Sequence, residues 1–298
     1  MKKSSRCFRG WGRPTPWLLL GVAFFLSSCA TAPKTTPPDP FTRFPQGALV
    51  YLAVDAVKAR PILEAIPKSQ AIPSAVLDRT ATIHAAFYPA GGERRFLAAA
   101  RGRYPNFRAG ISLAFNARWK KRRSATGGSY WYSAQEDLGI SLGTDQVLVS
   151  DGDPYTAEGA SFVQVPEGFA AFSHDAALAG WITEGAMPLN QLLSSLELPL
   201  RIPAGQVLFN LQQSGKSGNH YEAMIRLETP SASQAKALVM LFSLARPFIL
   251  ATPDPSLLAR VLFMQPPVLD DRSVNLRTGA LDAQEVALLF SLFSVYSK

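Results

Sequence analysis

The stretch Ala48-Leu-Val-Tyr-Leu-Ala-Val-Asp-Ala56 marks the start of the folded body. Residues 48–54 form a compact apolar run with Val, Tyr and Leu, which is typical of a buried strand. Asp55 fits the N-cap of a helix that extends to Ile66, because its carboxylate can accept from the first free backbone N–H groups. Pro61 interrupts or starts this helix. The stretch therefore predicts a strand that leads directly into a helix.

Outward from this stretch, the chain alternates between strand and helix signals. Apolar or alternating runs between turn residues predict strands over 80–88, 95–101, 129–134, 138–150, 168–172, 207–213, 221–228 and 273–280. Helices are predicted over 107–119, over a segment after residue 174 that contains Trp181, over 189–196 and 257–264, and from residues 229 and 282 onward. Asp282 and Glu285 predict a capping box. The fold class is α+β, with a mixed or antiparallel sheet and packed amphipathic helices.

The chain shows signs of an internal repeat. Phe169-Ala-Ala-Phe-Ser-His-Asp-Ala176 has the layout of the opening stretch, a strand that leads into Asp-Ala and a helix. Residues 82–115 and 207–241 both contain a hairpin, a proline and a helix. These likenesses predict two related βαββα halves, about 46–160 and 161–298 within a body of residues 46–298. The alternative is that any βαββα chain shows this much likeness.

The N-terminus carries the features of an export signal. Basic residues precede an apolar run over 17–26 and small residues, and the basic residues are Lys2, Lys3, Arg6, Arg9 and Arg13. Leu26-Ser27-Ser28-Cys29 resembles the lipobox of bacterial lipoproteins. The resemblance implies a signal peptide over 1–28 and a Cys29 that carries acyl chains such as palmitate. A proline-rich tether completes the segment 29–45. The alternative is an ordinary signal peptide with a chance cysteine.

Cleavage before Cys29 changes what the composition means. It removes five of the 30 lysine and arginine residues and no acidic residue, so the net charge falls from +8 to +3. The basic balance is then poor support for nucleic-acid binding, and we expect no nucleic-acid partner. Cys7 is lost with the signal and Cys29 is lipidated, so thiol catalysis and cysteine-ligated metal are excluded.

Candidate catalytic groups are sparse. The histidines His84, His174 and His220 lack the spacing of metal ligands. His174 neighbours Asp175, but adjacent residues of a strand face opposite sides. A pocket that joined these two residues to another acid would revive an enzymatic role. We predict a protein that is not an enzyme and has no metal or cofactor.

Two short motifs are interpreted as turns. Gly215-Lys216-Ser217 resembles the end of a phosphate-binding loop, but that motif needs a glycine where this chain has Asn210. A hairpin turn explains it. Ser150-Asp-Gly-Asp-Pro154 lacks the spaced ligands of a calcium loop and has ordinary turn chemistry.

One cationic cluster stands out: Arg118, Trp119, Lys120, Lys121, Arg122 and Arg123. Tyr130, Trp131 and Tyr132 follow it. Cations near aromatic rings suit a membrane interface, where they meet anionic phospholipid headgroups. The alternatives are a solvated charged edge strand, which prevents aggregation, and another polyanion.

The C-terminal helices are unusually apolar, and the last has polar residues only on a narrow stripe. Their apolar runs are too short to span a bilayer, which needs about 20 residues. They suit either core packing or the membrane interface. The candidates for contact with acyl chains, or for lining an apolar cavity, are Phe242, Leu289, Phe290 and Phe293.

The lipobox, tether, duplicated α+β body and apolar helices together resemble the treponemal lipoproteins held on the periplasmic leaflet of the outer membrane. This resemblance implies amphipathic helices that insert into the bilayer and open an apolar lipid-binding cavity. Ala30 after the lipidated cysteine also favours the outer membrane. The alternative function is a non-enzymatic scaffold or accessory protein in envelope assembly, with an envelope protein as its partner.

Overall fold

The computed structural model describes residues 41, 44–66, 74–89, 91–92, 94–155, 161–185, 190, 205–215, 219–251, 253 and 257–295. The chain divides into two units, Met1–Asp39 and Pro40–Lys298, and all of these residues belong to the second unit. The predicted signal peptide, Cys29 and most of the tether therefore lie outside the described residues.

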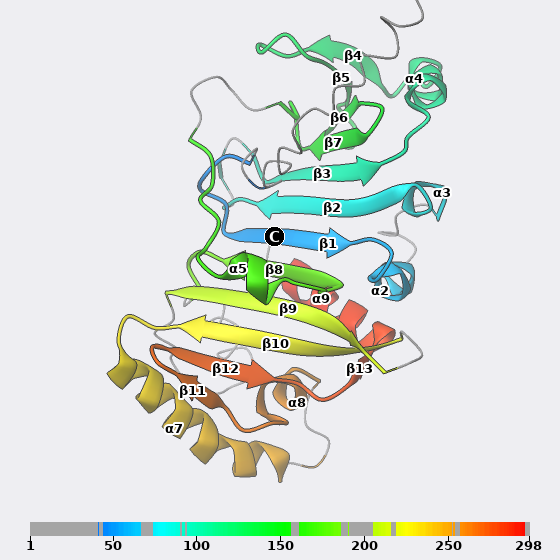
Figure 1. The fold of residues 1–298 in the computed structure, drawn as a ribbon. Coiled ribbons are helices and arrows are strands. Elements are labelled where there is room, and N and C mark those ends of the chain that lie inside the picture. Colours follow the sequence, from blue (N-terminus) through cyan, green and yellow to red (C-terminus); the bar gives the residue numbers. More distant parts are fainter. Residues whose placement is uncertain are drawn as a thin grey trace, which may run out of the picture. The chain divides into compact units, whose positions relative to one another are not determined.

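The described residues form one sheet of 13 strands (Figure 1). These strands are β1 (Val50–Asp55), β2 (Thr80–Phe87), β3 (Phe96–Gly102), β4 (Lys120–Arg123), β5 (Ser129–Ser133), β6 (Leu138–Leu142), β7 (Gln146–Ser150), β8 (Leu178–Ile182), β9 (Gln206–Ser214), β10 (His220–Glu228), β11 (Val268–Asp270), β12 (Ser273–Arg277) and β13 (Leu281–Asp282). Their order is β11-β12-β10-β9-β8-β1-β2-β3-β7-β6-β5-β4, and β13 pairs with β10 beside this path.

All pairings between these strands are antiparallel, and β1 and β8 meet in the middle of the order. The hairpin β2–β3 continues the sheet from β1, and the hairpin β9–β10 continues it from β8. Both hairpins confirm the sequence prediction. The predicted α+β class is confirmed as well, whereas the division into two related halves stays a prediction.

Seven helices with described bounds accompany the sheet (Figure 1). They are α2 (Arg60–Ala65), α3 (Ser74–Leu77), α4 (Asn106–Ala114), α5 (Phe169–Phe172), α7 (Ala232–Leu250), α8 (Leu257–Phe263) and α9 (Ala283–Val295). Asp282 Oδ1 accepts from the Glu285 backbone N–H at 2.8 Å, and Glu285 Oε2 accepts from the Asp282 N–H at 3.0 Å. This reciprocal pair confirms the predicted capping box of α9.

Alternation along β1 places buried side chains on both faces of the sheet. Val54 faces a core shared with α2, α8 and α9, where it clusters with Ile62, Val261 and Val286. Tyr51 faces the opposite side, which α5 covers. A third cluster packs α7 and α8 on the strands near β12. The helices therefore lie on both faces, as Figure 1 shows for α5 in front of the sheet and α8 and α9 behind it.

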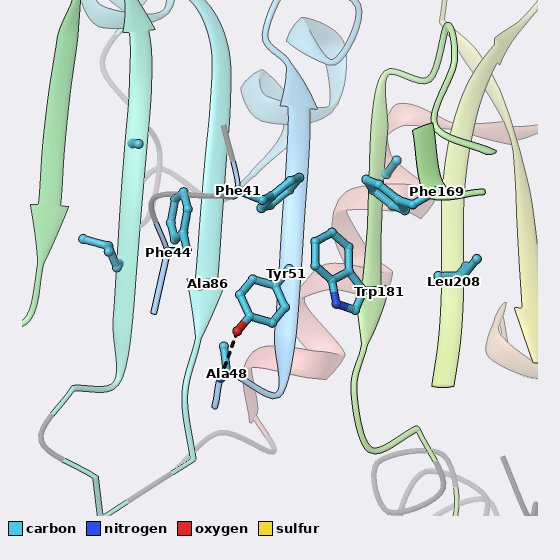
Figure 2. Close-up of a cluster of buried hydrophobic side chains, with 11 residues drawn as sticks. Phe41, Phe44, Ala48, Tyr51, Ala86, Phe169, Trp181 and Leu208 are labelled. Carbon is cyan, nitrogen blue, oxygen red and sulfur yellow. Dashed lines mark hydrogen bonds between the residues drawn. The ribbon is translucent and has the colours of Figure 1, made fainter. Parts of the chain in front are cut away.

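Aromatic rings fill the core on the Tyr51 side (Figure 2). Tyr51 of β1 stacks on Trp181 of β8, with 4.7 Å between ring centroids and 20° between planes. Phe41 and Phe169 meet Trp181 edge-on, each at 4.7 Å. The Tyr51 hydroxyl accepts from the Ala48 N–H at 3.2 Å and donates to the Pro45 carbonyl at 3.0 Å. Burial raises the pKa of this hydroxyl, against a smaller opposite effect of the Ala48 hydrogen bond.

Several predicted elements are wrong in type or extent. Residues 169–172 form α5 and not a strand, because Gly168 adopts a φ of 76° that breaks extended backbone. Trp181, expected in a helix, lies in β8 between β1 and β9. The strand predicted over 138–150 is the hairpin β6–β7. The repeat match that paired residues 48–56 with 169–176 is therefore wrong as a strand-to-strand match.

Candidate membrane-facing surfaces

Helix α4 presents apolar side chains to solvent. It follows Pro105, and none of its residues is buried. Phe107, Ile111 and Phe115 are 76%, 42% and 88% exposed. Residues spaced by four lie along one stripe of a helix, so these three side chains form a continuous apolar ridge that ends just beyond α4. An apolar stripe is normally turned toward the core, and here it is turned away from it.

Strand β4 lies beside this helix and carries only cations. It is the last strand in the order, and Lys120, Lys121, Arg122 and Arg123 are all exposed. Among the described residues, these four side chains have no carboxylate partner within ion-pair distance. The predicted alternative of a charged edge strand is thus correct as a description of the geometry.

The aromatic residues near these cations lie on the neighbouring strand β5 and just before β4. Tyr130 is buried, whereas Trp131 and Tyr132 on β5 and Trp119 before β4 are half-buried. Helix α4 packs against β4 and β6, as Figure 1 shows at the upper end of the sheet. We call the ridge Phe107, Ile111 and Phe115 together with residues Lys120–Arg123 the α4–β4 surface. It combines an apolar ridge with cations, as a membrane interface requires.

A second apolar surface lies on α7. Ser231 caps this helix through the Gln234 N–H, and Ala235, Leu238 and Phe242 face the core. On the outer side Met240, Leu244 and Phe248 are 65%, 67% and 77% exposed, again at four-residue spacing. We call these three residues the α7 surface.

Of the described helices, α7 alone has the length and apolar composition of a membrane span. Within its apolar 18-residue stretch, 17% is buried in the protein. Core helices of soluble proteins also meet these criteria. The expectation that the C-terminal helices are too short to span a bilayer is therefore wrong for α7 by length. Its Arg246 side chain folds back onto α8, where it donates to the carbonyls of Phe263 and Met264 at 3.0 and 2.9 Å.

The structure separates the predicted lipid-contact residues. Phe242 is 1% exposed and its ring centroid lies 5.3 Å from that of Phe263, so it belongs to the core and not to a lipid-facing surface. Leu289 is partly buried and packs against two core clusters. The side chains of Phe290 and Phe293 lie outside the described residues, as does Cys29.

The two surfaces are not brought together by the sheet. The α4–β4 surface includes one terminal strand of the order, and α7 packs against β11 and β12 at the other end. Sequence reasoning found the cations but missed Phe107, Ile111, Phe115 and the exposed side of α7. The four-residue spacing of large apolar side chains is the signal that was available in the sequence.

Other candidate groups form no catalytic constellation among the described residues. His174 Nδ1 lies 3.0 Å from Asp175 Oδ2 in the turn after α5, so the expectation of opposite orientation on a strand is wrong. Both side chains are more than two-thirds exposed, at 79% and 75%, and Asp175 also contacts Lys58 at 3.3 Å. No group of three or more histidine, cysteine or acidic residues is arranged to hold a metal in the described part of the chain.

The two turn motifs have the predicted geometry where the structure describes them. Strands β9 and β10 flank the Gly215 segment and pair from Ser214 with His220, which confirms a hairpin. Asp153 Oδ1 accepts from the Tyr155 N–H at 2.9 Å, an ordinary turn contact.

Comparison with known proteins gives a likeness in structure only. No protein-family description and no curated protein sequence matches this chain. Three crystal forms of the treponemal protein TP0453 match it over 85% of its length. Crystal form III has a TM-score of 0.60 at 19% identity and is covered over 98% of its own chain. Forms IV and I have TM-scores of 0.58 at 19% and 18% identity, each covered over 96%. The chain therefore shares the fold of TP0453.

Proposed function

We propose that this chain is a non-enzymatic lipoprotein, anchored through Cys29, whose α4–β4 surface binds the phospholipid bilayer of the outer membrane. The observation that carries the proposal is the exposed ridge of Phe107, Ile111 and Phe115 beside a strand of four exposed cations. The fold shared with the treponemal protein TP0453 supports the proposal, because the sequence also resembles treponemal lipoproteins in its general plan.

The apolar ridge and the cations of the α4–β4 surface would contribute comparable free energies to membrane binding. Full burial of one Phe or Ile side chain contributes about 1.5–3 kcal/mol, and each cation near an anionic surface about 1 kcal/mol. An acyl anchor at Cys29 would confine the protein to the bilayer, so even weak contacts from the body would act at high effective concentration. The α4–β4 surface would then orient the body on the membrane.

Vesicle flotation of residues 30–298, made without acyl chains, tests the proposal. We expect flotation on anionic vesicles that weakens with salt, because salt screens the cations but not apolar burial. The double variant Phe107→Ser/Phe115→Ser should lose the salt-resistant part. The matched control is Val57→Ser, since Val57 is 73% exposed and lies outside both surfaces. Absence of flotation on neutral and anionic vesicles alike would refute the proposal.

The α7 surface favours a second function, contact with an envelope protein. Its exposed side chains Met240, Leu244 and Phe248 lie at the opposite end of the strand order from the cations. Retention of a partner in mild detergent that is lost in Leu244→Ser/Phe248→Ser, together with no vesicle binding, would support the scaffold function. Loss of flotation in this variant would instead make α7 the lipid-contacting helix.

A further inference from the structure

A polar hollow lies on the sheet face opposite the C-terminal helices, over β9, β10 and the β11–β12 turn and beside α5. Its volume is about 510 Å³. Sites for small molecules commonly measure about 300–1,000 Å³. The residues that bear on its chemistry are Arg226, Glu228, Asp270, Glu167, Leu208 and Phe172. The hollow shares no residue with the α4–β4 surface or the α7 surface, so it is independent of the proposed function.

The Arg226 guanidinium lines this hollow and makes no hydrogen bond among the described residues. Its guanidinium meets Asp270 Oδ2 at 3.6 Å and Glu228 Oε1 at 3.9 Å, both beyond hydrogen-bond distance. Its Nε atom is buried and has no hydrogen-bond partner among the described residues. A guanidinium offers five N–H donors in a planar fork, and a buried donor without an acceptor is unfavourable. The buried Nε is closed to a ligand, so a carboxylate or a similar oxygen pair would meet the terminal N–H groups of this partly exposed guanidinium.

The charge balance of the hollow disfavours a simple anion as its ligand. Four carboxylates and two guanidiniums line it, so its fixed charge favours a cation. Glu228 and Asp270 flank Arg226, and Glu167 makes no ion pair or hydrogen bond among the described residues. An anion alone would meet these carboxylates, whereas an ammonium group would be attracted to them.

Strand register fixes how these groups face the hollow. Arg226 and Glu228 are two residues apart on β10 and share one face, and Leu208 is the cross-strand partner of Arg226. Asp270 ends β11 opposite Ser273 of β12. Phe172, which is half-buried, supplies apolar surface beside the charges, whereas Leu208 is buried beneath it. The site thus offers a guanidinium fork, adjacent carboxylates and an apolar wall.

We propose that this hollow binds an α-amino acid with a cationic side chain. The ligand carboxylate would accept from the terminal N–H groups of Arg226, and its α-ammonium group would lie between Glu228 and Asp270. Its aliphatic stem would pack on Phe172, and the distal cation would reach Glu167. Each charged group of the ligand then meets a group of opposite charge, and its aliphatic stem meets an apolar surface.

Calorimetric titration of the full chain, purified in a non-ionic detergent, tests this site with L-lysine as the probe. We expect saturable binding at least about tenfold tighter than that of 1,5-diaminopentane, which lacks the carboxylate, or of hexanoate, which lacks the ammonium groups. Arg226→Gln should weaken lysine binding about tenfold or more. Arg277→Gln is the matched control, because Arg277 is an exposed arginine of β12 outside the hollow.

The relative affinities of lysine, the diamine and hexanoate distinguish an amino-acid site from a merely acidic surface. Equal binding of the diamine and lysine would show an acidic surface only and would overturn the proposal, as would the absence of saturable lysine binding. If Arg226→Gln unfolds, Glu167→Gln takes its place, since Glu167 is exposed and without a described partner. That variant should weaken lysine several-fold and leave hexanoate unchanged. An unchanged lysine affinity in a folded variant would contradict the site.

Discussion

The guanidinium carbon of Arg122 lies 4.0 Å from the centroid of the Tyr132 ring, across the β4–β5 pair. The Tyr132 hydroxyl in turn donates to Asp137 Oδ1 at 3.0 Å. The cation is therefore held against an aromatic face by a cation–π contact. Of the four cations of β4, Arg122 is held against the sheet by this contact. The other three are exposed and can contact a ligand or a membrane at this edge.

The double variant Lys120→Gln/Lys121→Gln should weaken binding to anionic vesicles at low salt. Each cation near the surface contributes about 1 kcal/mol, so the expected loss is roughly tenfold or more, and it should vanish at high salt. The control is Arg272→Gln/Arg277→Gln, which removes the same charge next to and within β12, toward the other end of the strand order. Equal losses in the two variants would show that net charge, and not β4, governs binding.

Helix α7 allows buried and exposed apolar residues to be compared two positions apart. Phe242→Ala should lower the free energy of unfolding by about 3–5 kcal/mol, because Phe242 is 1% exposed and packs on Phe263. Leu244→Ala should change it by no more than about 0.5 kcal/mol, because Leu244 is 67% exposed. Urea denaturation measures both. Similar losses of unfolding free energy in the two variants would contradict the burial of Phe242 and the exposure of Leu244 on α7.

The capping box of α9 gives a local test. Asp282→Ala removes the acceptor of the Glu285 N–H and should cost about 1 kcal/mol in the free energy of unfolding. Hydrogen exchange should speed up at the Glu285 amide in particular. Gln284→Ala, in the same first turn and exposed, is the control that should leave both measurements nearly unchanged. An equal effect of both substitutions would mean that the cap does not hold the helix.

The elements that the sequence predicts well are those with local determinants. Both long hairpins, the capping box and the charged edge strand depend on turn residues, alternation and charge, which are visible in short windows. Trp181 shows where this fails. A short apolar run does not distinguish helix from strand, and here the pairing of β8 with β1 and β9 decides.

For a related reason, the sequence predicts the cations of the candidate site but not its exposed apolar residues. The cations of β4 are apparent in any window, but exposure is a property of the folded chain. Phe107 and Phe242 are both phenylalanines on helices, and one is 76% exposed whereas the other is 1% exposed. The groups around Arg226 come from four separate segments, and their meeting depends on strand register, which no spacing in the sequence reveals.

Asp151 predicts a specific dependence of stability on pH. Its side chain is 7% exposed, and it accepts from the Arg95 and Phe96 backbone N–H groups at 2.6 and 3.0 Å and from Arg95 Nε at 3.1 Å. Burial alone raises the pKa of Asp151, but these hydrogen bonds outweigh it and hold the pKa below its ordinary value of 3.8. A depressed folded pKa means that the stabilisation is complete above the unfolded pKa and is lost as pH falls through the folded one. Urea unfolding from pH 7 to pH 2.5 should therefore show a loss below about pH 4. Asp151→Asn should have a free energy of unfolding about 2 kcal/mol lower at neutral pH, and that free energy should fall less on acidification than in the unsubstituted chain.

Asp145→Asn is the control, since Asp145 is exposed and makes no described side-chain contact. Matching pH profiles for Asp151→Asn and the unsubstituted chain would show that this carboxylate does not link β3 to β7 as the structure indicates.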